Sequence, residues 1–159
     1  GTNGIQALDL VGRKMNFNDG EIVNTFFSII DKFIKDLSSN KDIDFKLRTD
    51  QFIKSYKDLT DITNHLKLMN DNDKNSAAVE YLNMFSYVSI GYVWLKMLKI
   101  LIEKNNNKES EFLNAKITTG KYYFDKILPK TSYLKNHILS GASIYNDYKD
   151  DYFDTGYKI

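Results

Sequence analysis

A single proline, Pro129, interrupts the 159 residues of this chain. Proline ends or kinks a helix because it lacks the amide hydrogen and its ring clashes with the preceding turn, so the long proline-free segments can form helices. Their apolar residues recur every three to four positions, which is helical spacing. The sequence therefore predicts an all-α fold, an antiparallel helical bundle of about five to six helices.

Two amphipathic helices are predicted in the first half of the chain. Asn18 and Asp19 are interpreted as the N-cap of the first helix, and the polar residues 38–40 are expected to end it. After the second helix, residues 70–75 are expected to form a polar turn. The predicted buried stripes are Ile22, Phe26, Ile29, Ile30, Phe33 and Leu37 in the first helix, and Phe45, Phe52, Tyr56, Leu59, Ile62, Leu66 and Met69 in the second.

The most apolar helix is predicted over residues 76–104. Between residues 84 and 102 its polar side chains, apart from tyrosine and tryptophan tips, are Ser86, Ser89, Lys96 and Lys99. About 20 apolar residues suffice to cross a bilayer, but a lysine near the helix centre costs about 2.5–3.5 kcal/mol on insertion scales. We therefore predict a helix enclosed by the others, the most buried of the bundle, and no membrane span.

Two further helices are predicted on either side of Pro129. Small residues in the first would allow a neighbouring helix to approach closely, namely Ala115, Thr118, Thr119 and Gly120. Thr131 or Ser132 is interpreted as the cap of the second helix. The predicted inward residues are Phe112, Ala115, Lys116, Thr119, Tyr122, Tyr123 and Ile127 in the first, and Tyr133, Leu134, His137, Ile138, Gly141 and Ile144 in the second. Residues 146–159 are expected to be frayed or irregular.

Composition excludes several classes of function. The 22 basic and 21 acidic residues give a net charge of +1, so no overall field favours nucleic acid or an anionic membrane. Because the chain has no cysteine, disulfides and thiolate zinc sites are excluded, and we expect a reducing, cytoplasmic location. No secretory signal is visible at the N-terminus. His65 and His137 stand at no metal-binding spacing, so no metal site is expected.

Several short motifs resemble one enzyme family. Residues 1–14 read GTNGIQALDLVGRK, which resembles the segment that directly follows the catalytic glutamate in acyl-CoA dehydrogenases. Further motifs, at residues 81–85, 91–95, 112–116, 122–124, 127–129 and 141–142, are similar to the appended C-terminal domain of a subgroup related to 3-methylmercaptopropionyl-CoA dehydrogenase. The resemblance implies that residues 1–16 end the flavin-site loop and form the last catalytic-domain helix, and that residues 17–159 form the appended domain.

The resemblance implies an oxidoreductase that catalyses α,β-dehydrogenation. In this family a glutamate removes the α-proton of an acyl-CoA thioester, the β-hydrogen leaves as hydride to FAD, and the electrons pass to an electron-transfer flavoprotein. The family's catalytic glutamate lies just before the position of Gly1. No catalytic residue is therefore assigned in this chain, which is not expected to be active alone. Family members form dimers or tetramers, so a homo-oligomer is expected.

The resemblance also assigns two FAD-binding residues, Thr2 and Gln6. A threonine hydroxyl can hydrogen-bond phosphate or ribose oxygens, and an amide can meet the adenine edge. Two alternatives stay open. Thr2 with Asn3 can be an ordinary N-cap of a helix that turns Ile5, Leu8 and Val11 inward, and the whole chain can be a stand-alone helical interaction module without catalysis.

Overall fold

A computed structural model of the chain describes residues 1–37, 42–105, 110–149 and 152. Every regular element within these residues is helical, which confirms the all-α prediction. The α-helices are α1 Thr2–Asp9, α2 Glu21–Asp36, α3 Ile43–Leu68, α4 Asp71–Ser76, α5 Ala78–Asn105, α6 Glu111–Tyr122, α7 Lys130–Leu139 and α8 Ser143–Asn146. Shorter turns join them: the π-helical η1 Leu10–Lys14 and η3 Tyr123–Ile127, and the 3-10 turn η2 Phe17–Gly20.

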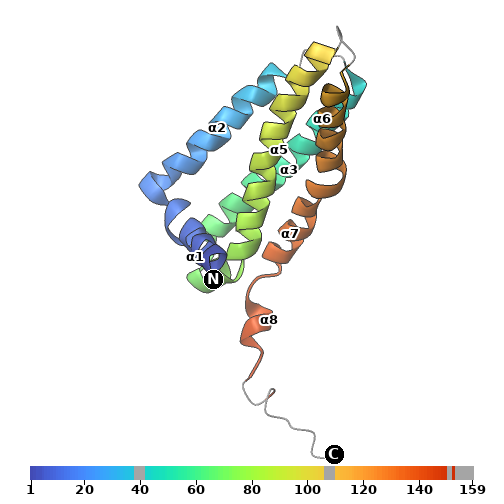
Figure 1. The fold of residues 1–159 in the computed structure, drawn as a ribbon. Coiled ribbons are helices and arrows are strands. Elements are labelled where there is room, and N and C mark those ends of the chain that lie inside the picture. Colours follow the sequence, from blue (N-terminus) through green and yellow to red (C-terminus); the bar gives the residue numbers. More distant parts are fainter. Residues whose placement is uncertain (38–41, 106–109, 150–151, 153–159) are drawn as a thin grey trace, which may run out of the picture.

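The long helices form an up-and-down bundle (Figure 1). α2 and α5 run in one direction, and α3 and the consecutive α6 and α7 run in the other. α3 and α5 supply most of the largest fully buried side chains. Large aromatic side chains join α2 to α5, with ring centroids 5.3 Å apart for Phe26 and Phe85 and 5.2 Å apart for Phe33 and Tyr92. The fully buried core includes Phe45, Phe52, Leu59, Ile62, Leu66, Tyr81, Met84, Val88 and Leu95.

The start of α2 differs from the prediction. Asn18 and Asp19 do not cap the helix, because both have left-handed backbone angles, with φ of 47° and 56°. Gly20 follows with φ of 83° in the N-cap position, and no side chain caps the helix. Asparagine, aspartate and glycine are the residues that tolerate this conformation best. They therefore build a sharp reversal of the chain between η2 and α2.

α5 is less enclosed than predicted. Neighbouring helices cover its sides toward α2, α3 and the α6–α7 pair, whereas Ile90 and Val93 are 47% and 51% exposed. The segment Ala78–Glu103 is long and apolar enough to cross a bilayer, with mean hydropathy 1.4, and 22% of its apolar window is buried. Because the sequence of α5 is apolar on all sides, it does not indicate which side of the helix lacks a neighbouring helix. That α5 does not span a membrane remains a prediction.

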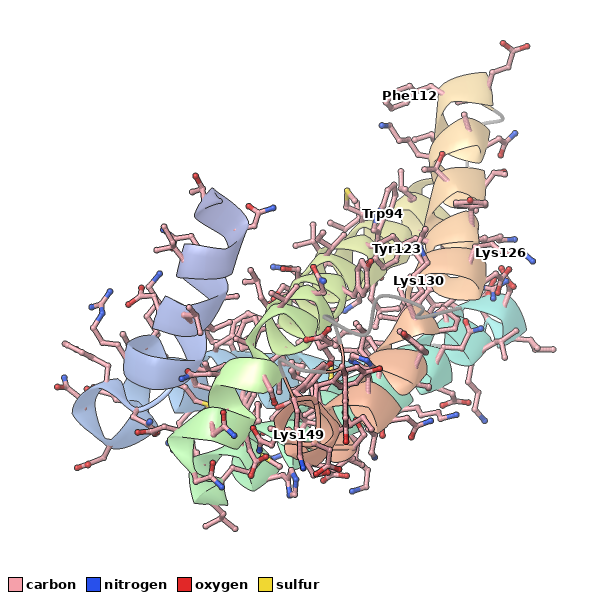
Figure 2. All side chains as sticks on the ribbon, turned by 90° about the horizontal axis from the view of Figure 1, so that it is seen from below. Trp94, Phe112, Tyr123, Lys126, Lys130 and Lys149 are labelled. Carbon is pink, nitrogen blue, oxygen red and sulfur yellow. The ribbon has the colours of Figure 1, made fainter. Side chains whose placement is uncertain are left out.

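The inward face of α6 was predicted wrongly. Phe112 is 66% exposed, and Ala115, Lys116, Thr119 and Tyr122 are also exposed. Figure 2 shows Phe112 at the free end of α6, away from the rings of Trp94 and Tyr123, which stack between α5 and η3. The π turn η3 shifts the helical register, so Tyr123 and Phe124 are buried although the predicted residues before them are not.

Gly120 is the one small residue of α6 that serves close packing as predicted. A Cβ atom at this position would lie 2.8 Å from Leu98 Cδ2, so a larger residue would push α6 away from α5. Ala115, Thr118 and Thr119 are exposed instead.

The C-terminal helices confirm the predictions only in part. Leu134 and Ile138 are buried as predicted, but Tyr133 and Ile144 are exposed. Neither Thr131 nor Ser132 caps α7, which begins at Lys130 without a side-chain cap.

Thr131 is buried instead and donates a hydrogen bond to the carbonyl of Leu128 at 2.8 Å. Ile144 faces away from the bundle because α7 ends at Leu139 and Gly141, with φ of 69°, redirects the chain.

The predicted polar turn at residues 70–75 is the helix α4, because Asn70 caps it by accepting a hydrogen bond from the Asp73 amide at 3.0 Å. The predicted helix end at residues 38–40 lies outside the described residues. Of the tail predicted to be irregular, Asn146 is instead the last residue of α8. Residues 147–149 and Tyr152 are exposed, and residues 150–151 and 153–159 lie outside the described residues.

Candidate functional site

The two predicted FAD-binding residues lie on the free face of α1. Thr2 and Gln6 are both exposed, and their spacing of four places them one turn apart on the same side of the helix. The opposite side packs on the bundle through Ala7 and Val11. Lys14 Nζ donates a hydrogen bond to Gln6 Oε1 at 3.3 Å, so Gln6 lies beside a positive charge.

The N-cap interpretation of Thr2 is wrong. α1 begins at Thr2 itself, Gly1 occupies the N-cap position, and no side chain caps the helix. The inward face of α1 was predicted correctly only at Val11, which is fully buried. Ile5 is 67% exposed and Leu8 is half exposed.

A charged cluster follows at the junction of α1 and η1. Arg13 Nε and Nη2 donate hydrogen bonds to Asp9 Oδ1 and Oδ2 at 2.7 and 2.9 Å. Lys14 Nζ lies 3.0 Å from Asp9 Oδ2. The hydrogen bonds from Arg13 and Lys14 lower the pKa of Asp9 to about 2. Two cations therefore surround one carboxylate at this junction, and two further carboxylates, Asp19 and Glu21, follow in η2 and α2.

The π turn η1 positions these cations. The Met15 amide donates to the Leu10 carbonyl at 2.9 Å, five residues back, which defines a π turn. Such turns recur at functional sites because the extra residue redirects side chains. Arg13 and Lys14 consequently reach both the polar face of α1 and the cavity beside it.

An apolar cavity of about 520 Å³ lies next to the charged cluster. The stacked rings of Phe26 and Phe85 belong to its wall. Its volume falls in the range of small-molecule sites, about 300–1,000 Å³. The lining residues are Leu10, Arg13, Lys14, Phe17, Ile22, Val23, Phe26 and Phe85.

The other perturbed ionisable groups hold helices together. Burial raises the pKa of Tyr81 to about 12, and its hydroxyl lies 2.9 Å from the Thr63 hydroxyl. Burial also raises the pKa of Tyr56 and Tyr123, whose hydroxyls donate to backbone carbonyls of α2 and α5. The part of the chain that the structure describes contains no cluster of three or more potential metal ligands among His, Cys, Asp and Glu.

Sequence reasoning missed the residues that make the cavity. Leu10, Arg13 and Lys14 come from the helix predicted within residues 1–16, whereas Phe17 and Val23 come from η2 and α2. The available signal was the Asp9–Arg13 pair at helical spacing together with Gly12 inside an otherwise helical pattern. It does not reveal that α2 packs across η1.

The fold and this edge define an all-helical bundle domain with a polar N-terminal face and an adjoining apolar cavity. Residues 26–148 match the family model described as "Acetyl-CoA dehydrogenase C-terminal like". Because this match covers more than half of the chain, the protein belongs to this acyl-CoA dehydrogenase C-terminal family. A comparison with curated proteins found no match.

Proposed function

We propose that this chain is the C-terminal part of an FAD-dependent enzyme that dehydrogenates an acyl-CoA thioester between its α and β carbons. The family match over residues 26–148 carries the proposal. The resemblance of residues 1–14 to the segment after the catalytic glutamate supports it. In the complete enzyme that glutamate stands just before Gly1, and this chain supplies no catalytic base.

Thr2 and Gln6 are proposed to contact FAD, which in the complete enzyme accepts the hydride from the substrate. The free face of α1 fits such a ligand, because Thr2 and Gln6 present a hydroxyl and an amide on the same exposed side. Lys14, bonded to Gln6, adds a positive charge suited to a phosphate group. This chain's part is to bind and orient the cofactor.

The finer assignments form part of the same proposal. The subgroup is the one related to 3-methylmercaptopropionyl-CoA dehydrogenase, the electron acceptor is an electron-transfer flavoprotein, and the complete enzyme is a cytoplasmic homo-oligomer. The domain boundary is placed after residue 16, and the family match begins further along, at Phe26. The exposed Ile5 and Leu8 would be covered by the catalytic domain.

The test uses the complete coding sequence. The expected protein purifies with bound flavin and reduces an electron acceptor in the presence of an acyl-CoA, and replacing the glutamate before Gly1 by glutamine abolishes turnover while flavin is retained. In FAD titrations of the apo-enzyme, Thr2→Ala and Gln6→Ala each weaken binding by about 0.5–1.5 kcal/mol. Unchanged affinity in both variants refutes the two contacts but leaves the family assignment intact.

A second candidate function is a helical interaction module without chemistry. The uncovered face of α5 favours it, because Ile90 and Val93 leave apolar area exposed at helical spacing. A start codon directly before Gly1, together with a flavin-free protein, would favour the module over the enzyme.

A further inference from the structure

One side of α5 carries a stripe that the neighbouring helices leave uncovered in the part of the chain that the structure describes. The other sides pack on α2, α3 and the α6–α7 pair, and α1 packs near the start of the helix (Figure 1). Ile90, Val93 and Ile100 of the stripe are 47%, 51% and 49% exposed. The stripe residues follow one another at alternating intervals of four and three: Val79, Asn83, Ser86, Ile90, Val93, Met97 and Ile100.

The spacing of this stripe indicates what kind of neighbour fits it. Alternating intervals of four and three average 3.5 residues, which is the repeat of a coiled-coil seam, where one helix lies along another. A helix that faces a broad surface carries a wider apolar sector instead. The stripe therefore indicates a single helix packed lengthwise on α5.

The stripe is complementary to itself when two copies of α5 run parallel and in register. Each residue then faces its own counterpart, so the apolar part from Ile90 to Ile100 meets apolar side chains. The polar Asn83 and Ser86 meet at the other end. An asparagine at a single seam position specifies register and oligomeric state, since two asparagine amides can hydrogen-bond each other. An antiparallel pair centred between Ile90 and Val93 sets Asn83 against Ile100 instead.

The flanks of the stripe differ from each other. Lys96 lies on the flank toward α2, where its Nζ is 5.2 Å from the ring centroid of Tyr92, and Tyr92 packs on Phe33 of α2. The opposite flank carries Tyr87 and Trp94. A parallel pair brings unlike flanks together. Each Lys96 therefore meets the aromatic flank of the other copy and not the other Lys96.

A second cation stands on the aromatic flank, but at another level of the helix. Lys130 Nζ lies 6.0 Å from the ring centroid of Tyr87. Tyr87 precedes Lys96 in the sequence by nine residues, which is about 13 Å along a helix. This separation exceeds the screening length of about 8 Å at physiological salt. Glu80, near the start of α5, lies 3.3 Å from His137. No like charges therefore face each other at the centre of the contact.

We propose that α5 pairs with α5 of a second copy of this chain, parallel and in register, through the stripe from Ile90 to Ile100. The two copies are related by a two-fold axis along the helices, so one surface supplies both sides of the contact. The pairing uses this chain alone and needs neither FAD nor an acyl-CoA. It therefore does not rest on the proposed dehydrogenase reaction.

Single cysteines test the pairing directly, because the 159-residue chain has none of its own. In a parallel pair in register, each seam residue lies beside its counterpart, within reach of a disulfide. Ile90→Cys and Val93→Cys should therefore each form a cross-linked dimer under mild oxidation. Ile53→Cys, on α3 and 38% exposed, is the matched control and should stay monomeric on a denaturing gel.

A mixture of the Ile90→Cys and Val93→Cys chains tests the orientation. The parallel pair should cross-link each variant to itself as well as in the mixture. An antiparallel pair would instead cross-link the two different variants to each other in preference to themselves.

Sedimentation equilibrium measures the pairing without cysteine. The unaltered chain should change from monomer to dimer as its concentration rises from about 1 μM to 1 mM, the range expected of a small interface. Ile90→Asp should raise the dissociation constant of the dimer at least about tenfold, because it buries an unpaired charge in the seam. Ile53→Asp should leave it unchanged. Circular dichroism checks that each variant keeps its helices, and if Ile90→Asp unfolds, the cross-linking comparison decides the question.

The pairing would be overturned by an unaltered chain that stays monomeric over this range, or by cross-linking of Ile53→Cys as readily as Ile90→Cys. Preferential cross-linking in the mixture, or a dimer unaffected by Ile90→Asp, would also overturn it. A monomer that binds anionic phospholipid vesicles would identify a membrane surface instead. If the complete protein forms oligomers in which Ile90→Cys does not cross-link, the pairing is refuted while the flavin and turnover tests of the proposed function still stand.

Discussion

The α3–α5 core and the N-terminal edge of the molecule are built in opposite ways. In the core, Phe52, Leu59 and Met84 lie on regular helices and are fully buried. At the edge, η1 and η2 are irregular, and Ile5 and Ile22 expose apolar surface. Regular backbone with complete burial serves stability, whereas irregular backbone with incomplete burial is typical of ligand and partner sites.

The largest expected effect is the difference in stability loss between a core variant and an edge variant. Phe52→Ala removes a fully buried ring and should lower the free energy of unfolding by about 3–5 kcal/mol. Ile5→Ala at the edge should change it by less than about 0.5 kcal/mol. Urea unfolding followed by circular dichroism measures both. A large loss from Ile5→Ala would show that the edge also stabilises the isolated chain.

Glycine substitutions give a second comparison. At Gly120 a new methyl group would lie 2.8 Å from Leu98 Cδ2, so Gly120→Ala should cost about 1–3 kcal/mol by overpacking. At Gly12 no atom lies within 4 Å of the new Cβ, so Gly12→Ala should raise stability by about 0.5–1 kcal/mol. Thermal unfolding of both variants checks the opposite signs. Destabilisation by Gly12→Ala would show that the π turn requires glycine.

Tyr81, one of three core tyrosines whose pKa is raised by burial, should contribute to a fall in stability at alkaline pH. Because the pKa of Tyr81 is raised to about 12 in the folded state, the unfolded chain loses this proton first, from about pH 10 upward. Stability therefore declines between about pH 10 and pH 12. Tyr81→Phe should flatten this decline while costing about 0.5–1.5 kcal/mol at neutral pH. If the stability of Tyr81→Phe declines with pH as steeply as that of the unaltered chain, other groups cause the alkaline decline.

The smallest expected effect is at the N-terminal edge, where stability should fall at acidic pH and not at alkaline pH. The pKa of Asp9 is depressed to about 2 from its ordinary 3.8, so its contribution is present above about pH 4 and is lost as the pH falls toward 2. Because the group is exposed, the change in melting temperature should be small. Asp9→Asn should remove it, and raised salt should reduce it. An effect that is independent of salt would contradict the exposed ion-pair interpretation.

The buried face of a regular helix was predictable for α3, because its apolar period is unbroken, but only in part for α2, where Ile22 and Ile29 are 56% and 50% exposed. The buried stripe of α3, from Phe45 to Leu66, lies where its spacing placed it. α6 was misread because η3 inserts an extra residue after Tyr122, so spacing before the insertion no longer reports the same face as spacing after it.

The edge was less predictable for a different reason. Asparagine and aspartate are common both in helix caps and in left-handed turns. In the structure Asn18 and Asp19 form a left-handed turn. The cavity arises from the way α2 crosses η1, which no local pattern encodes. Thr2 and Gln6 follow from family resemblance, and their contact with FAD remains a proposal.

The up-and-down order of the helices also has a kinetic consequence. Among the long helices, α3 runs against α2, α5 against α3, and the α6–α7 pair against α5 (Figure 1), and α3 packs on α5 and α5 on α6 and α7. The contacts of α3 with α5 and of α5 with α6 therefore close short loops. Helical bundles with such local contacts fold in microseconds to milliseconds, so this unit needs only a brief time to assemble its core.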